Sequence, residues 1–469
     1  MIKKILIACI LALAMSGYAI AAISEQETAQ LGGPTLTPIG AEKAGTKDGM
    51  IPAWTGGITK GADGWYYDGK LKVPFSKFDP KKSGYRPDPF ADDNILFTVS
   101  AQNMNQYKEK LTTGLQALMA KYPNEVKLNV YPSRRSMSYN DHLVETQKKV
   151  ALTARLEKDG NSLVGCWGAF PFPIPKNGLE VIWNHTVNWS GTVEFYRYKG
   201  YLVTAAGRPV MTNRANAYYE YPFWDPNPSV ADKDTESIIF KVLDDTIGPV
   251  NRVGEGTIGW HFTDKTKGGP AWIYLPGQRR VKLAPEVSFD GPNTNLAGQA
   301  VIDECYMFVG SPERYDWKLI GKKEMLVPYN NYKAQFWTKT LDLLGKKFLK
   351  PEPVRFEMHR VWVIEAKLKP GQRHIYHKRI LYLDEDSWYT YMEDLYDAKG
   401  QLWRTKLLLN TFNYDVQAPS NKNDTGFDLI AGTYYVNTHP GSDEGGVWYL
   451  PQRGPNFWVP AILAGRGIR

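Results

Sequence analysis

The chain has few cysteines, and this limits the covalent and metal chemistry that it can carry. Only three cysteines occur among 469 residues. Cys9 lies in the apolar N-terminus, so the mature protein is expected to keep only Cys166 and Cys305. These two could form one disulfide in an oxidising compartment or remain buried thiols. No second cysteine or close histidine accompanies either residue, so we expect no metal site at them.

Signatures of common enzymes are also absent. The chain has no Gly-x-Ser-x-Gly, no His-Glu-x-x-His and no convincing Ser-x-x-Lys motif. Gly254, Gly256 and Gly259 have the spacing of a dinucleotide-binding loop, but the Trp-His-Phe-Thr that follows predicts a strand or loop instead of the required helix. We therefore expect a protein without catalytic residues, cofactor or metal.

Three groups of ionisable residues could form sites, and two of them have simpler interpretations. Asp384-Glu385-Asp386 falls where a hairpin turn is expected, which predicts solvated turn residues. Asp303-Glu304 is the other acidic pair. His374 and His377 differ by three positions, which in a strand places them on opposite faces and prevents them from binding one metal ion.

The charge is mildly basic and evenly spread. The chain has 57 Lys and Arg against 49 Asp and Glu, a formal net charge of +8. Nucleic-acid binding normally requires clustered basic stripes, so we expect no nucleic-acid partner. A weak peripheral attraction to anionic lipid headgroups fits this charge better.

The N-terminus predicts export. Lys3 and Lys4 precede an apolar run over residues 5–15, and Ala19-Ile20-Ala21 provides a small-residue cleavage site. A run of roughly a dozen residues is too short to span a hydrocarbon core about 30 Å thick. Residues 1–21 are therefore predicted to be a cleaved signal peptide, and the protein to be periplasmic.

Composition divides the mature chain into two parts. Residues 22–95 are rich in Gly and Pro but keep many aromatic residues, which predicts an extended arm lying over the main body. Residues 96–469 are predicted to form one domain. Apolar spacing predicts helices around residues 107–118, 143–154 and 332–344.

The remaining sequence favours β-structure. Residues 193–198 and 201–205 flank Lys199-Gly200 as a predicted hairpin, and residues 271–275 lead through Pro276-Gly277 into residues 279–283. Residues 355–413 predict a four-stranded antiparallel meander. The expected fold class is α+β, with a large curved antiparallel sheet and helices packed against it.

Several long motifs resemble one bacterial family. They are LGGPTLTPIGAE at residues 31–42, IPAWTGG at 51–57, FDGPNT at 289–294 and GSPERYDW at 310–317. The chain is similar to a family of unknown function whose members are often called outer-membrane lipoprotein-sorting proteins. AWIYLPGQRRV at 271–281 and the Tyr382-Leu383-Asp384 hairpin also resemble strands of the lipoprotein carriers LolA and LolB.

This resemblance implies a half-open barrel around a hydrophobic cavity for acyl chains. It also implies an exporter of the resistance-nodulation-division type and an outer-membrane protein as partners. The 15 Trp and 28 Tyr could line such a cavity, although a sandwich core with surface tyrosines explains them equally well. The cavity candidates, chosen by strand position, are Trp272, Tyr274, Trp362, Ile364, Tyr382, Trp388, Tyr391 and Trp403.

Two functional hypotheses follow. The first is a periplasmic carrier or chaperone of a lipid, lipoprotein or other hydrophobic cargo between the inner and outer membranes, with Arg279 and Arg280 contacting a headgroup or a partner. The second is a periplasmic carbohydrate-binding or hydrolytic protein that uses aromatic platforms and carboxylates. An exposed turn is an equally good explanation of the two arginines.

Overall fold

The computed structural model describes residues 23–467, except residues 60–64, 68–71, 75–78, 80, 82, 227–237, 285–288 and 421. The predicted signal peptide, residues 1–21, lies outside the described residues. Within them, no helix has the length and apolar character that crossing a bilayer requires.

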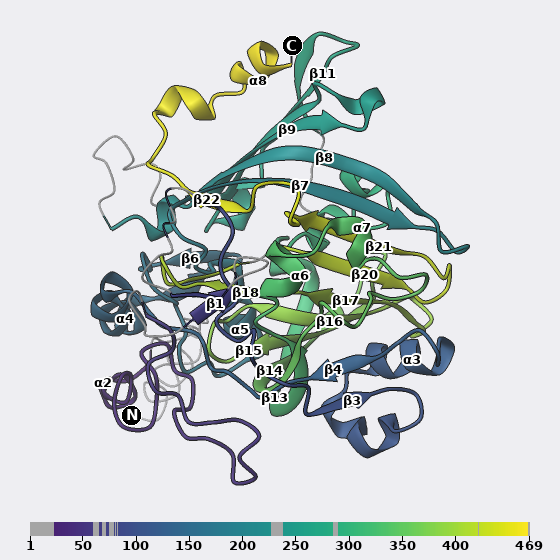
Figure 1. Ribbon diagram of the computed structural model, residues 1–469. Helices are drawn as coiled ribbons and strands as arrows, with labels where there is room; N and C mark the ends of the chain where they lie inside the picture. The colour runs from purple at the N-terminus through teal and green to yellow at the C-terminus, as the bar shows by residue number, and fades with distance from the viewer. Residues whose placement is uncertain are drawn as a thin grey trace, which may run out of the picture.

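A sixteen-stranded sheet dominates the described chain (Figure 1). It is antiparallel except where β4 pairs with β14, and it does not close on itself. The α+β class with a large antiparallel sheet, predicted from the sequence, is confirmed. From one edge to the other the strands are β12 (Arg280–Leu283), β11 (Ala271–Leu275), β10 (Gly256–Phe262), β9 (Ile238–Gly248), β8 (Pro209–Glu220), β7 (Val193–Val203), β21 (Tyr434–His439), β20 (Asp424–Asp428), β17 (Leu402–Leu408), β16 (Thr390–Tyr396), β15 (Lys378–Asp384), β14 (Phe356–Leu368), β4 (Leu128–Val130) and β3 (Phe97–Val99).

Other strands extend or flank this sheet. β13 (Tyr315–Pro328) pairs with β14 along most of its length, and β22 (Val447–Tyr449) pairs with β7. Among the described residues, three two-stranded sheets are separate from it. They are β1 (Trp65–Tyr67) with β2 (Lys72–Pro74), β5 (Arg155–Glu157) with β6 (Ser162–Val164), and β18 (Thr411–Asn413) with β19 (Ala418–Ser420).

The meander over residues 355–413 is confirmed. β14, β15, β16 and β17 pair in order, each antiparallel to the next. The hairpin of β11 and β12 across Pro276-Gly277 is also confirmed. The glycine motif starting at Gly254 leads into strand β10, so no helix N-terminus follows it and the loop-or-strand interpretation is correct.

The hairpin predicted at Lys199-Gly200 is wrong. β7 continues through both residues, with a register shift between Gly200 and Tyr201. A Cβ atom at Gly200 would lie 3.1 Å from Thr212 Oγ1. The glycine therefore allows a β-bulge in β7 and the close approach of Thr212 on β8. The chain instead reverses at residues 204–208, where Gly207 has a φ of 77°.

Seven α-helices occur in the described chain. They are α2 (Glu25–Ala29), α3 (Thr113–Lys121), α4 (Asp141–Thr153), α5 (Gly178–Thr186), α6 (Tyr332–Phe336), α7 (Thr340–Leu343) and α8 (Ile462–Arg466). Side-chain caps fix the starts of the longer ones, since Thr112 accepts from Leu115 N at 3.1 Å and Asn140 accepts from Leu143 N at 2.8 Å. In Figure 1 the first helix, α2, and the last, α8, lie at opposite ends of the molecule.

The helix predictions are correct in place but not always in form. Residues 143–154 fall within α4 almost entirely. Residues 107–118 divide into a 3₁₀ helix, Met104–Lys110, and α3. The single helix predicted over residues 332–344 is wrong, because the chain breaks it at residues 337–339 into α6 and α7.

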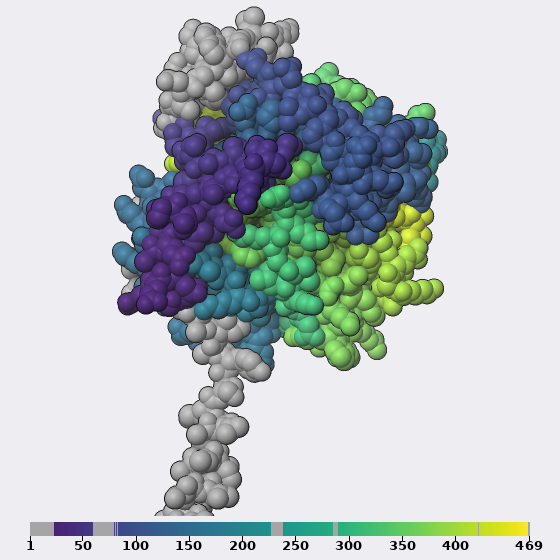
Figure 2. Space-filling view, turned by 90° about the horizontal axis from the view of Figure 1, so that it is seen from below, coloured from purple at the N-terminus to yellow at the C-terminus, as the bar shows by residue number. Residues whose placement is uncertain are grey.

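The N-terminal segment, residues 23–59, lies across one face of the molecule, where Figure 2 shows it in purple against teal and green parts of the chain. Apolar anchors hold it there, since Ile39 and Ile51 are buried in the main core. Trp54 Nε1 also donates to Met137 O at 2.8 Å. The division of the chain into an arm and one domain remains a prediction.

The expectation of a solvated turn at Asp384-Glu385-Asp386 is wrong, since all three are at most 2% exposed. The N-terminal segment covers the turn, because Glu42 N donates to Glu385 Oε2 at 3.3 Å. Arg135 also donates to both oxygens of Asp386, at 2.6 and 2.8 Å. The hydrophobic pattern of the sequence could not show that the N-terminal segment and Arg135 bury this turn.

The strand placement of the two histidines is also wrong. β15 begins only at Lys378, so His374 and His377 precede it. His374 is buried and its Nε2 lies 3.1 Å from Asp303 Oδ2. It belongs to a buried network of charged groups.

Candidate functional site

The eight predicted cavity residues do not come together. Trp272 and Tyr274 lie on β11 in a small cluster with Trp458 and Leu463. Trp403 packs in another cluster beside Tyr376. The other five belong to or contact the main core, namely Trp362, Ile364, Tyr382, Trp388 and Tyr391.

The candidate residues in the main core lie on both faces of the sheet. Ile364 pairs with Leu381, the neighbour of Tyr382, so Ile364 and Tyr382 point to opposite sides. Trp388 is fully buried, stacks on Trp362 with ring centroids 5.9 Å apart, and donates to Ile39 O at 3.2 Å. These aromatic residues fill the core beneath the N-terminal segment.

The two arginines predicted to contact a headgroup or a partner are exposed to solvent. Arg279 and Arg280 are exposed at the turn between β11 and β12.

Cys166 and Cys305 are unpaired, so the disulfide that they could have formed is not present. Each makes its own local contact instead. Cys166 Sγ donates to Ala169 O, and Asn293 Nδ2 donates to Cys305 Sγ, both at 3.4 Å.

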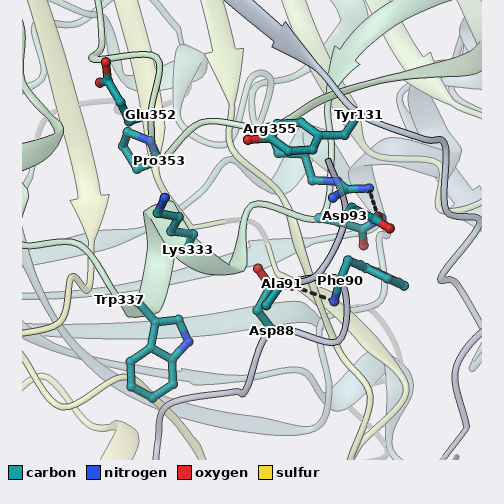
Figure 3. Close-up of a pocket in the computed structure, with 11 residues that line it drawn as sticks. Asp88, Phe90, Ala91, Asp93, Tyr131, Lys333, Trp337, Glu352, Pro353 and Arg355 are labelled. Atoms are coloured by element: carbon teal, nitrogen blue, oxygen red, sulfur yellow. Dashed lines mark hydrogen bonds and ion pairs between the residues drawn. The ribbon is translucent and has the colours of Figure 1, made fainter. Parts of the chain in front are cut away.

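A pocket of about 440 Å³ opens where β4 and β14 meet. The first residue after β4, Tyr131, donates through its backbone N–H to Phe356 O at 2.9 Å. Segments distant in sequence form the pocket walls, as Figure 3 shows. The lining residues are Asp88, Phe90, Ala91, Asp93, Tyr131, Asn330, Lys333, Trp337, Glu352, Pro353 and Arg355.

Arg355 organises one wall of this pocket. Its guanidinium carbon lies 5.5 Å from the centroid of the Phe90 ring and 4.8 Å from that of Tyr131. It also donates to Asp93 Oδ2 at 2.7 Å and to Glu357 Oε1 at 2.5 Å. Because its charge is balanced by two carboxylates, Arg355 holds the wall in place and offers little free charge to a ligand.

Lys333 and Trp337 form the opposite wall. Lys333 lies on α6 and is exposed, and Trp337 follows the helix and is half-buried. Trp337 Nε1 donates to Arg86 O at 3.2 Å, which fixes the indole. Within the part of the chain that the structure describes, no carboxylate pairs with Lys333. Its ammonium group is thus available to an anionic ligand.

Asp88 lies between these walls. Its Oδ1 accepts from Phe90 N at 2.8 Å. Burial raises the pKa of Asp88 to about 6, with the nearby carboxylates Asp93 and Glu357 adding to the rise. Near pH 6 this group therefore changes between a neutral donor and an anion.

Sequence reasoning did not identify this pocket. Its walls come from four separate segments, and pairing of β4 with β14 unites them. One local signal was present. Lys333 and Trp337 are four residues apart in a region predicted as helix, which places them on one side of that helix.

A second cavity, of about 370 Å³, is mostly aromatic and apolar. Trp189 and Trp224 meet in its wall, edge to face, with ring centroids 5.3 Å apart. His142 is the one ionisable imidazole among its lining residues, and no lysine, arginine or carboxylate is among them.

The comparison with known proteins decides the family. Residues 98–463 match the family model described as "Protein of unknown function (DUF1329)". The chain belongs to the DUF1329 family. An uncharacterized protein of Pseudomonas aeruginosa, PA3922, is 37% identical over 462 residues, covering 96% of this chain and 95% of its own length. The family resemblance predicted from the motifs is confirmed.

Solved structures resemble this DUF1329 protein more distantly. A domain of Vibrio parahaemolyticus, described as an outer membrane lipoprotein-sorting protein, has 14% identity and a TM-score of 0.42, covering 61% of this chain and 98% of its own. A LolA superfamily protein of Nitrosomonas europaea, NE2245, has 10% identity and a TM-score of 0.36, with the same coverage.

Proposed function

We propose that this DUF1329 protein is a periplasmic carrier of an amphiphilic or hydrophobic cargo between the inner and outer membranes, and that it performs no chemistry on that cargo. One observation carries the proposal. The pocket combines the aromatic groups of Phe90, Tyr131 and Trp337 with the ammonium group of Lys333, which pairs with no carboxylate among the described residues. This combination suits a molecule with an apolar body and an anionic end.

The size of the pocket restricts the cargo. Small-molecule sites range over about 300–1,000 Å³, and this one measures about 440 Å³. It is suited to one headgroup, one ring system or part of one acyl chain. The several chains of a lipoprotein anchor would exceed it, so we favour a single amphiphile over a whole lipoprotein.

The cellular setting belongs to the same proposal. The signal-like N-terminus favours the periplasm, and the sequence resemblance to lipoprotein carriers favours an exporter of the resistance-nodulation-division type and an outer-membrane protein as partners. Arg279 and Arg280, exposed at the turn between β11 and β12, are candidates for contact with a partner or a membrane surface.

Native mass spectrometry of mature protein purified from the periplasm tests the proposal, followed by organic extraction and lipid analysis. We expect a defined anionic amphiphile to copurify. Trp337→Ala and Lys333→Ala should each weaken its binding at least about tenfold, which corresponds to about 1.4 kcal/mol. Matched controls are Trp272→Ala, also a half-buried tryptophan, and Lys339→Ala, also an exposed lysine near α6.

Equal ligand retention in Trp337→Ala and Trp272→Ala would remove the pocket from the proposal. A soluble glycan that quenches tryptophan fluorescence, with no lipid bound, would instead support the carbohydrate-binding alternative. Release of hydrolysed glycan would show that the protein is an enzyme.

A further inference from the structure

Three buried side chains form a cluster apart from the pocket. His359 lies on β14, Asp384 ends β15, and Asp386 lies in the turn that follows. A ring nitrogen of His359 and one carboxylate oxygen from each aspartate all lie within 4.8 Å of one another. The three residues are at most 1% exposed.

Asp384 has an unused ligand atom. Its Oδ2 accepts from Ser387 Oγ at 2.7 Å and from Tyr329 Oη at 3.2 Å. Its Oδ1 is buried and has no hydrogen-bond partner. No lysine or arginine among the described residues forms an ion pair with Asp384. A buried acceptor without a partner costs free energy, which a bound cation would remove.

His359 is oriented as metal-binding histidines are. Its Nε2 lies 3.0 Å from Glu357 Oε2, and Arg355 holds the other oxygen of Glu357 at 2.5 Å. An ionised Glu357 accepts a hydrogen bond from the Nε2–H group of His359, so the lone pair of the neutral imidazole lies on Nδ1. Carboxylate–histidine pairs of this kind fix the tautomer and ring orientation in metal sites. The ring of Tyr329 stacks on His359 with centroids 3.7 Å apart and restrains it further.

Asp386 can serve a cation and Arg135 together. Arg135 donates to both of its oxygens, at 2.6 and 2.8 Å. A carboxylate offers about four lone-pair sites, so two remain after a bidentate arginine. The neighbouring cations Lys322 and Arg360 are directed elsewhere, because both pair with Glu385.

We propose that His359, Asp384 and Asp386 bind one divalent transition-metal ion, with Zn²⁺ as its best representative. One imidazole nitrogen and two carboxylate oxygens are ligands that zinc accepts. The burial of all three makes the site structural, since no substrate can reach it. The ion would fasten the turn after β15 to β14. This inference does not depend on the pocket or its cargo.

Metal analysis of the whole mature protein tests this site. Protein without a histidine tag is purified from zinc-supplemented cells and measured by elemental mass spectrometry. We expect about one zinc per chain, with His–carboxylate ligands at about 2.0–2.2 Å in X-ray absorption spectra. After chelation, titration of zinc against a competing dye should restore one equivalent.

Variants then assign the ligands. Asp384→Asn and His359→Gln should abolish stoichiometric binding, while Glu357→Gln should weaken it about 10- to 100-fold because it only positions the histidine. Asp424→Asn is the matched control, a buried carboxylate in another cluster. It should keep one zinc per chain.

Folded wild-type protein that binds no zinc at micromolar free metal would overturn the proposal. Zinc retained in Asp384→Asn, or an absorption spectrum without a histidine ligand, would also overturn it. The zinc content and the X-ray absorption spectrum of the wild-type protein test the site even if a variant does not fold.

Discussion

The two faces of the central strands β15, β16, β17 and β20 are covered in opposite ways. On one face, charged side chains such as Arg379, Glu393 and Lys406 are buried beneath residues 302–304. On the other, apolar side chains such as Leu407 lie beneath α3, together with the buried carboxylate Asp394, which accepts from Gly114 N of α3 at 3.1 Å. The same strands therefore present one face rich in buried charged groups and one mainly apolar face, and the two faces should respond differently to substitution.

The charged face depends on pairing. Asp303 accepts from Arg379 at 2.7 Å, and Lys406 lies 3.4 Å from Asp424. Glu304 joins the network through Arg404, 3.4 Å away. Burying charge is costly, so these pairs add little net stability, but the loss of one partner leaves an uncompensated ion.

The apolar face depends on area and shape. Met392, Leu407, Phe427 and Val436 are at most 1% exposed and share one cluster with Leu115 of α3. Each such side chain contributes about 1.5–3 kcal/mol through burial. The comparison teaches that burial depends on ion pairing on one face of the strands and mainly on apolar packing on the other.

Removal of one buried cation should have the largest effect. Arg379→Met leaves the ionised Asp303 without its main partner, so we expect a loss of about 3–5 kcal/mol in the free energy of unfolding. Urea denaturation followed by tryptophan fluorescence measures it. A loss below 1 kcal/mol would mean that the network is not desolvated as described.

Truncation on the apolar face should come next. Leu407→Ala creates a cavity beneath α3, with an expected loss of about 3 kcal/mol. The same urea experiment compares it directly with Arg379→Met. Leu407→Ala removes no charged group, so it should change the pH dependence of stability less than Arg379→Met does. A larger change in Leu407→Ala would contradict the distinction between the two faces.

The charged face should contribute to the pH dependence of stability. Burial raises the pKa of Glu393 to about 8 and that of Asp424 to about 6. Because these pKa values are raised on folding, the contribution of each group is complete below the ordinary carboxyl pKa. It is lost as pH rises through about 6 for Asp424 and about 8 for Glu393. Glu393→Gln should flatten the fall in melting temperature between pH 5 and 8. An unchanged slope would show that Glu393 does not titrate there.

An exposed ion pair provides the smallest expected effect. Arg155 and Glu157 lie 3.1 Å apart with side chains 51% and 46% exposed. Arg155→Met should change the free energy of unfolding by at most about 1 kcal/mol, because water and salt screen the pair. A loss as large as that of Arg379→Met would mean that burial does not explain the difference.

Local sequence patterns predicted the strands that pair with their neighbours in sequence. The β14–β17 meander and the β11–β12 hairpin follow from alternating apolar residues and turn residues, whose effects act over a few positions. The Lys199-Gly200 prediction failed because a glycine can mark either a turn or a bulge, and only the pairing with β8 distinguishes them.

The sequence by itself determined the family, the antiparallel sheet and the positions of most helices, because these depend on long motifs and short-range periodicity. Tertiary structure decided the rest. The sequence pattern predicts that Asp384 and Asp386 are solvent-exposed turn residues. They are buried because the N-terminal segment and Arg135 cover the turn. The pocket at Lys333 exists because β4 pairs with β14 from far away in sequence. Charge burial and cavity shape arise from contacts between distant segments, and neither has a local pattern in the sequence.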